Sequence, residues 1–129
     1  MTITIRDLIE LHDYVIQKSG GATGIRDHRS LESAIHQPFM SFGGEPLFPD
    51  VRLQAVALCF YLVTSHPFID GNKRIGHAAM LLLLKLNGFE FIAPIADQEK
   101  VMLDLAAGLL DREEFSNWAL AHIFSVEGA

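Results

Sequence analysis

Apolar residues recur every three or four positions along much of the chain, which is the spacing of helices with one buried face. In the first such segment, Leu8 and Val15 fall on the same helical face. Thr4 is predicted to cap the N-terminus of this helix, with Asp7 as its capping-box partner. The glycine pair at 20–21 is predicted to end it. The first structural element is therefore predicted to be an amphipathic helix.

A shorter second helix is predicted after a glycine-rich loop. Either Asp27 or Ser30 is in a position to cap its N-terminus. Leu31 and Ile35 share one face, which predicts that this face is buried. Pro38 is predicted to end the helix, because proline has no backbone N–H to continue the hydrogen-bond ladder.

The segment 39–48 does not follow helical spacing. Gly43 and Gly44 form a strong turn signal, and aromatic residues lie on both sides of them. An extended flap or a hairpin is therefore predicted here.

Two segments, 51–63 and 78–84, are apolar on nearly every side. Helices of this kind belong in the middle of a protein, because no face is polar enough to meet water. The first is predicted to begin at Pro49, with Asp50 near its positive end. It is predicted to end near Ser65, because the residue before the next proline disfavours helical geometry.

The rest of the chain continues the helical pattern. The second central helix is predicted to start near Gly71 and Asn72 and to end at Asn87. The elements predicted beyond it are a short extended piece at 89–92, a fifth helix at 97–107 ended by Gly108, and a sixth helix that is capped by Asp111 and Glu114 and buries Phe115, Trp118 and Ile123. Together these elements predict an all-α fold, a compact bundle of about six helices with a short flap or β-hairpin.

Composition narrows the class of protein. The 129 residues, half of them apolar, are predicted to form a single domain, residues 1–129. The formal charge of −6 argues against broad binding of nucleic acid, which needs a basic face. Cys59 is the only cysteine, and its apolar neighbours predict a buried thiol, compatible with a reducing cytoplasm. The N-terminus does not read as a signal peptide, and no apolar run is long enough for a bilayer, so a cytoplasmic protein without a membrane partner is expected.

A cluster of polar residues lies between the two central helices, where residues 66–74 read HPFIDGNKR. Phe68 and, less strongly, Ile69 are predicted to point inward and anchor this loop. The first backbone N–H groups of the helix that follows have no partner within the helix, and with the helix dipole they favour an anion such as phosphate. His66 carries an imidazole that can take a proton from an attacking hydroxyl.

The other residues of the cluster suit a phosphate ligand. Gly71 lets the backbone approach a ligand closely, and Asn72, Lys73 and Arg74 add hydrogen-bond donors around the same point. Asp70 would repel a bare anion, but it fits a site where Mg²⁺ bridges the carboxylate and phosphate oxygens. The set is typical of phosphate transfer, although neither a Walker loop nor a G-x-G-x-x-G loop is present.

Residues 66–74 resemble the Fic/Doc signature, H-x-F-x-[DE]-[GA]-N-[GK]-R, and match every restricted position. The segments 24–27, 31–34, 42–44 and 86–89 are also similar to the small death-on-curing (Doc) toxins. The resemblance covers nearly the whole chain and implies the compact Fic/Doc-type helical bundle with a flap.

The resemblance also implies a protein-modifying enzyme. Fic proteins typically transfer the AMP part of ATP to a hydroxyl of a target protein, whereas Doc toxins phosphorylate a threonine of elongation factor Tu with the nucleotide bound in the reverse sense. By resemblance, His66, Asp70 and Arg74 are catalytic, and Asp70 binds Mg²⁺ together with the nucleotide phosphates. The remaining implied sites are a nucleotide site of Gly71, Asn72, Lys73, Arg74 and His77, and a flap of Phe42, Gly43, Gly44 and Glu45 that holds the target as an added strand.

Three positions bear on which group is transferred. AMP-transferring members usually have glycine in place of Lys73 and a second arginine in place of His77, so these two residues resemble Doc. Gly71 resembles Fic, since the best-known Doc version carries alanine. The prediction is a Doc-like toxin, paired with an antitoxin protein, that moves a phosphoryl group from ATP or another nucleoside triphosphate to a Ser/Thr hydroxyl of a translation factor such as elongation factor Tu. AMP transfer and a non-catalytic binding module remain as alternatives.

Residues outside the cluster are expected to have structural roles. Arg26 is expected to pair with Asp27 rather than to reach the nucleotide. His77 follows the loop by one helical turn and is either a site residue or a packing residue. The remaining histidines that lack the spacing of metal ligands are expected at the surface or in packing, and these are His12, His28, His36 and His122.

Overall fold

The computed structural model describes residues 2–126, and this part contains six α-helices, a short 3₁₀ helix and two small antiparallel sheets of two strands each. The predicted all-α bundle is therefore confirmed. The helices are α1 (Ile5–Ser19), α2 (His28–His36), η1 (Gln37–Phe39), α3 (Val51–Ser65), α4 (Asn72–Leu86), α5 (Ile95–Ala106) and α6 (Arg112–Leu120). The strands are β1 (Ser41–Phe42), β2 (Glu45–Pro46), β3 (Phe89–Phe91) and β4 (Ile123–Ser125). No helix in the described range is long and apolar enough to cross a bilayer.

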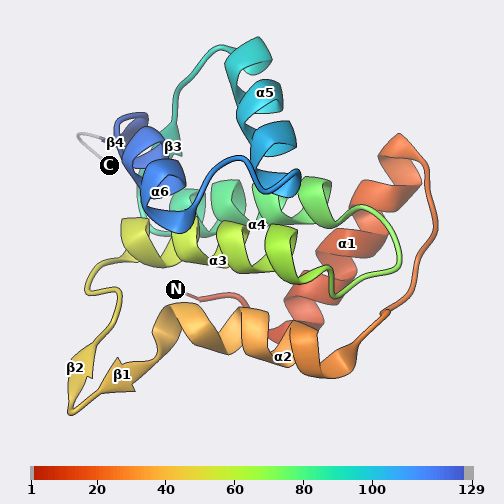
Figure 1. The fold of residues 1–129 in the computed structure, drawn as a ribbon, viewed down its shortest axis with the longest axis horizontal. Helices are drawn as coiled ribbons and strands as arrows, with labels where there is room; N and C mark the ends of the chain where they lie inside the picture. Colours follow the sequence, from red (N-terminus) through yellow and green to blue (C-terminus); the bar gives the residue numbers. More distant parts are fainter. Residues whose placement is uncertain (1, 127–129) are drawn as a thin grey trace.

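The two apolar helices α3 and α4 lie side by side at the centre of the molecule (Figure 1). Gly76 lets them approach closely, because a Cβ there would lie 2.6 Å from Cγ2 of Val63 and 3.1 Å from the carbonyl oxygen of Cys59. The thiol of Cys59 is fully buried in this contact region, and burial raises its pKa well above the usual range. The prediction of a buried thiol is confirmed.

The other helices surround this pair. Helices α2 and α6 pack on α3, α1 packs on α4, and α5 contacts both central helices (Figure 1). The loop from α3 to α4 emerges at the end of the pair that α1 approaches (Figure 1). This arrangement places a polar loop between a buried helix pair and the C-terminal end of α1.

The predicted helix caps are present. The hydroxyl of Thr4 accepts the N–H of Asp7 at 3.1 Å, and the Asp7 carboxylate accepts the N–H of Thr4 at 3.0 Å. Asp111 and Glu114 form the same reciprocal pair at the start of α6. Asp27 is the residue that caps α2. Caps of this kind are formed within one helical turn, which explains why they are visible in the sequence.

The start predicted for α3 is wrong. Pro49 lies outside the helix, which begins at Val51 and is capped by Asp50. The Asp50 carboxylate accepts the backbone N–H groups of Arg52 at 2.9 Å and Leu53 at 3.1 Å. A side-chain cap that satisfies two unpaired N–H groups decides where the helix begins, so the proline precedes the cap.

Two further boundaries differ at the C-terminal side. Helix α5 begins at Ile95, two residues before the predicted Asp97. Helix α6 ends at Leu120, so Ile123 is buried from strand β4 rather than from the helix. Strand β4 pairs antiparallel with the predicted extended piece, β3, and Ile123 lies opposite Phe91. Three residues are too few to show the alternation of a strand, which explains why the sequence did not reveal β4.

The predicted flap is a hairpin. Strands β1 and β2 pair through Phe42 and Glu45, and the turn residues Gly43 and Gly44 have φ angles of 60° and 84°. Positive φ at both positions is the requirement of a tight hairpin turn and favours glycine. The hairpin projects from the body at the N-terminal end of α3, whereas the α3–α4 loop lies at the C-terminal end of that helix (Figure 1).

Candidate active site

The α3–α4 loop begins with an unusual backbone conformation at His66. Helix α3 ends at Ser65, as the following His66–Pro67 pair predicts. His66 has φ 50° and ψ 56°, and it is the only non-glycine residue with positive φ in the part of the chain that the structure describes. Such a conformation costs free energy for an ordinary residue, although histidine is among the residues that tolerate it. It turns the chain sharply at the candidate catalytic base.

A hollow of about 290 Å³ opens beside this loop. It brings together most of the residues that the sequence indicated, including the imidazole, the carboxylate and the start of α4. Its lining consists of Val63, His66, Ile69, Asp70, Gly71, Asn72, Lys73, Arg74 and Ala106. The hairpin residues do not line it, and the length of α3 separates them from His66.

The loop is anchored in the core by one aromatic side chain. Phe68 is fully buried, as predicted, whereas Ile69 is wrong as a second anchor because its side chain is 58% exposed at the edge of the hollow. Asn72 reinforces the anchor: its side chain accepts the N–H of Phe68 at 2.9 Å and donates to the carbonyl oxygen of Phe68 at 3.0 Å. The side-chain amide of Asn72 is therefore engaged with the loop. Only the backbone N–H of Asn72, at the start of α4, is left as a donor toward an anion.

Asp70 is held as a carboxylate by backbone groups. Its Oδ2 accepts the N–H of Ala22 at 3.2 Å, and its Oδ1 accepts the N–H of Gly71 at 2.8 Å. These hydrogen bonds lower the pKa of Asp70, partial burial opposes the shift, and the nearby guanidinium of Arg74 lowers the pKa further. Asp70 is thus ionised at neutral pH and suited to a hard cation.

The donor set fits Mg²⁺ only together with a phosphate ligand. Among the described residues, no cluster of three or more His, Cys, Asp or Glu side chains is placed to hold a metal ion. Asp70 offers a single carboxylate, and Mg²⁺ commonly binds through one or two carboxylates plus phosphate oxygens and water. A magnesium ion at this loop would therefore need a nucleotide to complete its ligands.

Arg74 is turned toward helix α1 rather than into open space. Its Nη1 donates to the hydroxyl of Ser19 and, at 2.6 Å, to the carbonyl oxygen of Gly20. Its Nη2 lies 3.6 Å from Oδ1 of Asp70. The guanidinium thus compensates the negative C-terminal end of α1 while remaining at the edge of the hollow.

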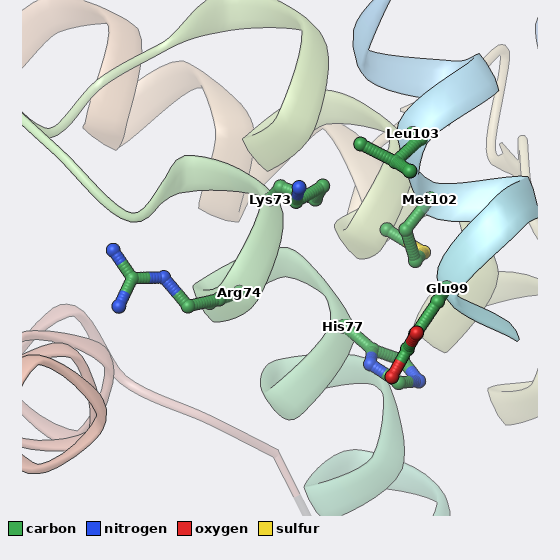
Figure 2. Close-up of a pocket in the computed structure, with 6 residues that line it drawn as sticks. All are labelled: Lys73, Arg74, His77, Glu99, Met102 and Leu103. Carbon is green, nitrogen blue, oxygen red and sulfur yellow. The ribbon is translucent and has the colours of Figure 1, made fainter. Parts of the chain in front are cut away.

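A second hollow, of about 240 Å³, lies between α4 and α5 and shares Lys73 and Arg74 with the first. Lys73 and His77 face Glu99, Met102 and Leu103 of α5 across it, while Arg74 extends the other way (Figure 2). His77 therefore lines a cavity as well as packing against α5. The amide nitrogen of Gln98 donates to the carbonyl oxygen of Ala93 at 2.9 Å, so its oxygen is left to accept from Nε2 of His77 at 2.8 Å.

The loop at 22–27 contributes contacts that the sequence did not reveal. The guanidinium of Arg26 donates from Nε to the carbonyl oxygen of His66 and from Nη2 to that of Ser65, so the expected pairing with Asp27 is wrong. The backbone N–H groups of Arg26 and Asp27 both donate to the carbonyl oxygen of Pro67, and that of Ile69 donates to Gly24. The glycine-rich loop therefore lies, like a short strand, against residues 66–74, the signature loop.

Helix α1 supplies a further contact. His12 is fully buried, and its Nε2 lies 2.7 Å from the carbonyl oxygen of Asp70. The expected packing role is confirmed, since the imidazole stacks on Phe68. The hydrogen bond to the signature loop was not expected, because no spacing rule connects positions so far apart in the sequence.

Comparisons with known proteins place the chain in a family. The model of the Fic/DOC family matches residues 2–84, which include the whole signature loop. The curated protein "Toxin Doc" of Mycolicibacterium smegmatis (strain ATCC 700084 / mc(2)155) is 34% identical over 74 residues. That match spans 57% of this chain and 57% of the length of the relative. Since the family model covers more than half of the chain, the protein belongs to the Fic/DOC family.

Proposed function

We propose that this protein transfers the γ-phosphoryl group of ATP, or of another nucleoside triphosphate, to a serine or threonine hydroxyl of a target protein. The observation that carries the proposal is the hollow at the α3–α4 loop, where His66, Asp70 and the start of α4 face one space. Gly71 leaves the first N–H groups of α4 without a side-chain cap. A base, a carboxylate for a cation and free N–H donors are the groups that phosphoryl transfer uses.

In the proposed reaction, the target hydroxyl oxygen attacks the γ-phosphorus while the imidazole of His66 accepts the hydroxyl proton. A new P–O bond forms, the bond from the γ-phosphorus to the bridging oxygen breaks, and the nucleoside diphosphate leaves with the electron pair. The N–H groups at the start of α4 and the ammonium of Lys73 stabilise the negative charge on the phosphate oxygens. Asp70 would hold a Mg²⁺ ion, which neutralises part of that charge when bound.

Arg74 would change partners when a nucleotide binds. Its guanidinium lies beside the hollow but donates to Ser19 and Gly20 at the end of α1. A phosphate can replace these two acceptors, because a planar guanidinium binds paired oxygens well. In the proposed complex, Arg74 therefore binds phosphate oxygens and releases the end of α1.

The charge of the second hollow supports transfer of the terminal phosphate. Glu99 places a carboxylate there beside the apolar side chains of Met102 and Leu103. A carboxylate repels phosphate but accepts hydrogen bonds from ribose hydroxyls, and apolar side chains suit a base. The nucleoside end is therefore proposed to occupy the second hollow. With that end bound there, the terminal phosphate reaches His66 across Lys73.

The β1–β2 hairpin is proposed to bind the target by strand addition, as the family resemblance implies. Its strands are exposed, and Phe42 at its turn is 82% exposed. Helix α3 has 15 residues, which at about 1.5 Å per residue separates the hairpin from His66 by roughly 20 Å. An extended chain spans that distance in about six residues, so the acceptor hydroxyl would lie about that far along the target from the paired strand.

The biological setting is proposed from the similarity to "Toxin Doc". In that setting the chain acts as the toxin of a toxin–antitoxin pair in the cytoplasm, and a separate antitoxin protein binds and controls it. A translation factor such as elongation factor Tu is the proposed target. Exposed apolar side chains on the described surface provide area for such partners.

AMP transfer is the second candidate, and Gly71 is the observation that favours it. A glycine at this position resembles the AMP-transferring members, and its φ of 75° is one that glycine adopts without strain. In this alternative the α-phosphate would lie at His66, and the group transferred to the target would be AMP.

One experiment separates the two activities. The purified protein is incubated with elongation factor Tu, or with a bacterial lysate, and ATP labelled at either the α- or the γ-phosphate. Label on a target from the γ-position alone supports phosphoryl transfer, and label from the α-position shows AMP transfer. The matched control is His66→Asn, which keeps the loop conformation accessible and removes the base.

A non-catalytic binding module would give a different result in cells. Wild-type protein and His66→Asn would then be equally toxic, or equally harmless, when each is expressed as a folded protein. Toxicity that depends on His66 supports the enzyme.

A further inference from the structure

His12 is the only fully buried polar side chain among the described residues, with a relative exposure of 1%. It belongs to α1, which otherwise buries Leu8 and Ile16 on the same face. Its ring lies flat on Phe68, with the ring centroids 3.8 Å apart and the planes 8° from parallel. Burying a polar group costs free energy unless it forms a hydrogen bond, and an apolar residue would satisfy the packing alone. The hydrogen bond of His12 is therefore the feature that an apolar residue at this position could not supply.

That hydrogen bond fixes the peptide unit between Asp70 and Gly71. Nε2 of His12 lies 2.7 Å from the carbonyl oxygen of Asp70, and a carbonyl oxygen only accepts, so Nε2 carries the proton. In a trans peptide the C=O and N–H bonds of one unit point in opposite directions. With the carbonyl directed at α1, the N–H of Gly71 is directed to the other side, where it donates to Oδ1 of Asp70 at the rim of the hollow.

Glycine at position 71 belongs to the same arrangement. A Cβ there would lie 2.8 Å from Cδ1 of Ile16 and 3.5 Å from Nε2 of His12. The loop backbone thus approaches α1 as closely as the two side chains allow. If the loop moved away from Ile16 and His12, the N–H of Gly71 would move with it.

We propose that His12 is a positioning residue for phosphate binding. Its Nε2–H holds the Asp70 carbonyl and so fixes the peptide unit whose N–H, that of Gly71, now donates to Oδ1 of Asp70 and would pass to a phosphate oxygen when that ligand binds. This inference rests on the proposed function, because it assigns His12 to the same site. His12 itself touches neither the nucleotide nor the target.

The test compares variants that separate the ring from the donor. His12→Phe keeps an aromatic ring for Phe68 but removes the N–H, whereas His12→Gln places an amide N–H close to the position of Nε2. The matched control is His122→Phe, because His122 also bonds a backbone carbonyl, that of Trp118 at 2.8 Å, and packs among aromatic rings far from the loop along the chain. Melting temperature, the kcat and KM of γ-phosphate transfer, and the amide NMR signal of Gly71 are measured for each protein.

We expect His12→Phe to lower kcat at least tenfold with a melting temperature similar to that of His122→Phe. His12→Gln is expected to recover most of the rate. In the wild type, inorganic pyrophosphate should shift the Gly71 amide signal, and the dissociation constant for pyrophosphate should rise at least fivefold in His12→Phe but not in the control. If His12→Phe does not fold, His12→Asn takes its place, since its shorter side chain does not reach the carbonyl.

Several results would overturn the inference. These are a wild-type rate and pyrophosphate affinity in His12→Phe, a loss in His12→Gln as large as that in His12→Phe, or a loss of rate that simply follows melting temperature across all variants. A wild-type Gly71 signal that does not respond to pyrophosphate also overturns it. By contrast, a normal pyrophosphate response without label transfer to any target refutes the proposed function and leaves the role of His12 standing.

Discussion

Arg26 donates a hydrogen bond from Nε to the carbonyl oxygen of His66 at 2.6 Å, and a second from Nη2 to that of Ser65 at 3.0 Å. These carbonyls belong to the end of α3, where helical partners are missing and the dipole is negative. The guanidinium of Arg26 donates hydrogen bonds to these carbonyls, and its positive charge compensates the negative end of the helix dipole. Because His66 has a positive φ, the clamp also stabilises a conformation that few residues adopt. The candidate base is therefore held from a loop forty positions earlier in the chain.

Replacing Arg26 by alanine is expected to slow transfer about tenfold, because the backbone that carries the imidazole of His66 would no longer be fixed. The free energy of unfolding should fall by about 1 kcal/mol, the net value of a typical hydrogen bond. Transfer assays and chemical denaturation measure the two effects. Arg29→Ala is the control, since Arg29 is an exposed arginine of the next helix. Equal rates for Arg26→Ala and the wild type would show that the clamp does not serve the site.

His66→Asn is expected to lower the transfer rate by about 10² to 10⁴, the range for loss of a general base. The fold should be retained, because asparagine adopts positive φ more readily than most residues. His66→Ala should lose the same activity but unfold at a lower temperature, since alanine is less favourable in this conformation. Activity assays and thermal unfolding distinguish the two variants, and an active His66→Asn would contradict the catalytic role.

Glu99→Lys reports which end of the nucleotide lies in the second hollow. If the nucleoside lies there, loss of the carboxylate should raise the KM for ATP about fivefold and change kcat little, because the contact is equal in the ground state and the transition state. Glu113→Lys, an exposed change of the same charge on α6, is the control. A lower KM in Glu99→Lys would instead indicate phosphates in this hollow and would favour AMP transfer.

Gly76→Ala is expected to lower the free energy of unfolding by about 1 to 2 kcal/mol. The added methyl would overlap Val63, and overpacking costs more than the helix propensity of alanine returns. Urea denaturation provides the measurement. A more stable variant would show that α3 and α4 can separate without cost.

Asp27→Asn should reveal the pH dependence of the α2 cap. Hydrogen bonds from Ser30, first through its backbone N–H and then through its hydroxyl, lower the pKa of Asp27 in the folded protein. Its carboxylate therefore stabilises the fold above the unfolded-state pKa of about 4, and this contribution is lost as the pH falls through the folded-state pKa. The variant should unfold at a lower temperature than the wild type at pH 6, and the gap should close toward pH 2. A gap independent of pH would contradict this account.

Much of the site was predictable because it depends on neighbours in the sequence. The apolar segments on both sides of the loop predicted two buried helices, and the residue before Pro67 predicted where α3 ends. Burial of Phe68 followed from its large apolar side chain in a mostly polar loop. Ile69, in contrast, is exposed although its residue type is apolar, because the loop is too short to turn two consecutive large side chains into the core.

The boundaries that failed depend on competition between neighbours. Pro49 and Asp50 are both acceptable near a helix start, and the one that forms two hydrogen bonds with the first turn became the cap. Ile123 has an apolar side chain that suits a helix or a strand. Its pairing with Phe91 in the two-stranded β3–β4 sheet decided for the strand.

The sequence by itself determined which segments become helices, where most of them are capped, and that a polar loop joins the two most apolar ones. These features follow from hydrogen bonds and burial patterns within a few residues, so local spacing records them. Only the tertiary structure decided what holds that loop, since His12 meets Asp70 from 58 positions away and Arg26 meets His66 from 40. Periodicity reports that a helical face is buried, but it does not report which distant carbonyl a buried imidazole or a guanidinium will find. That choice depends on how the helices pack against one another.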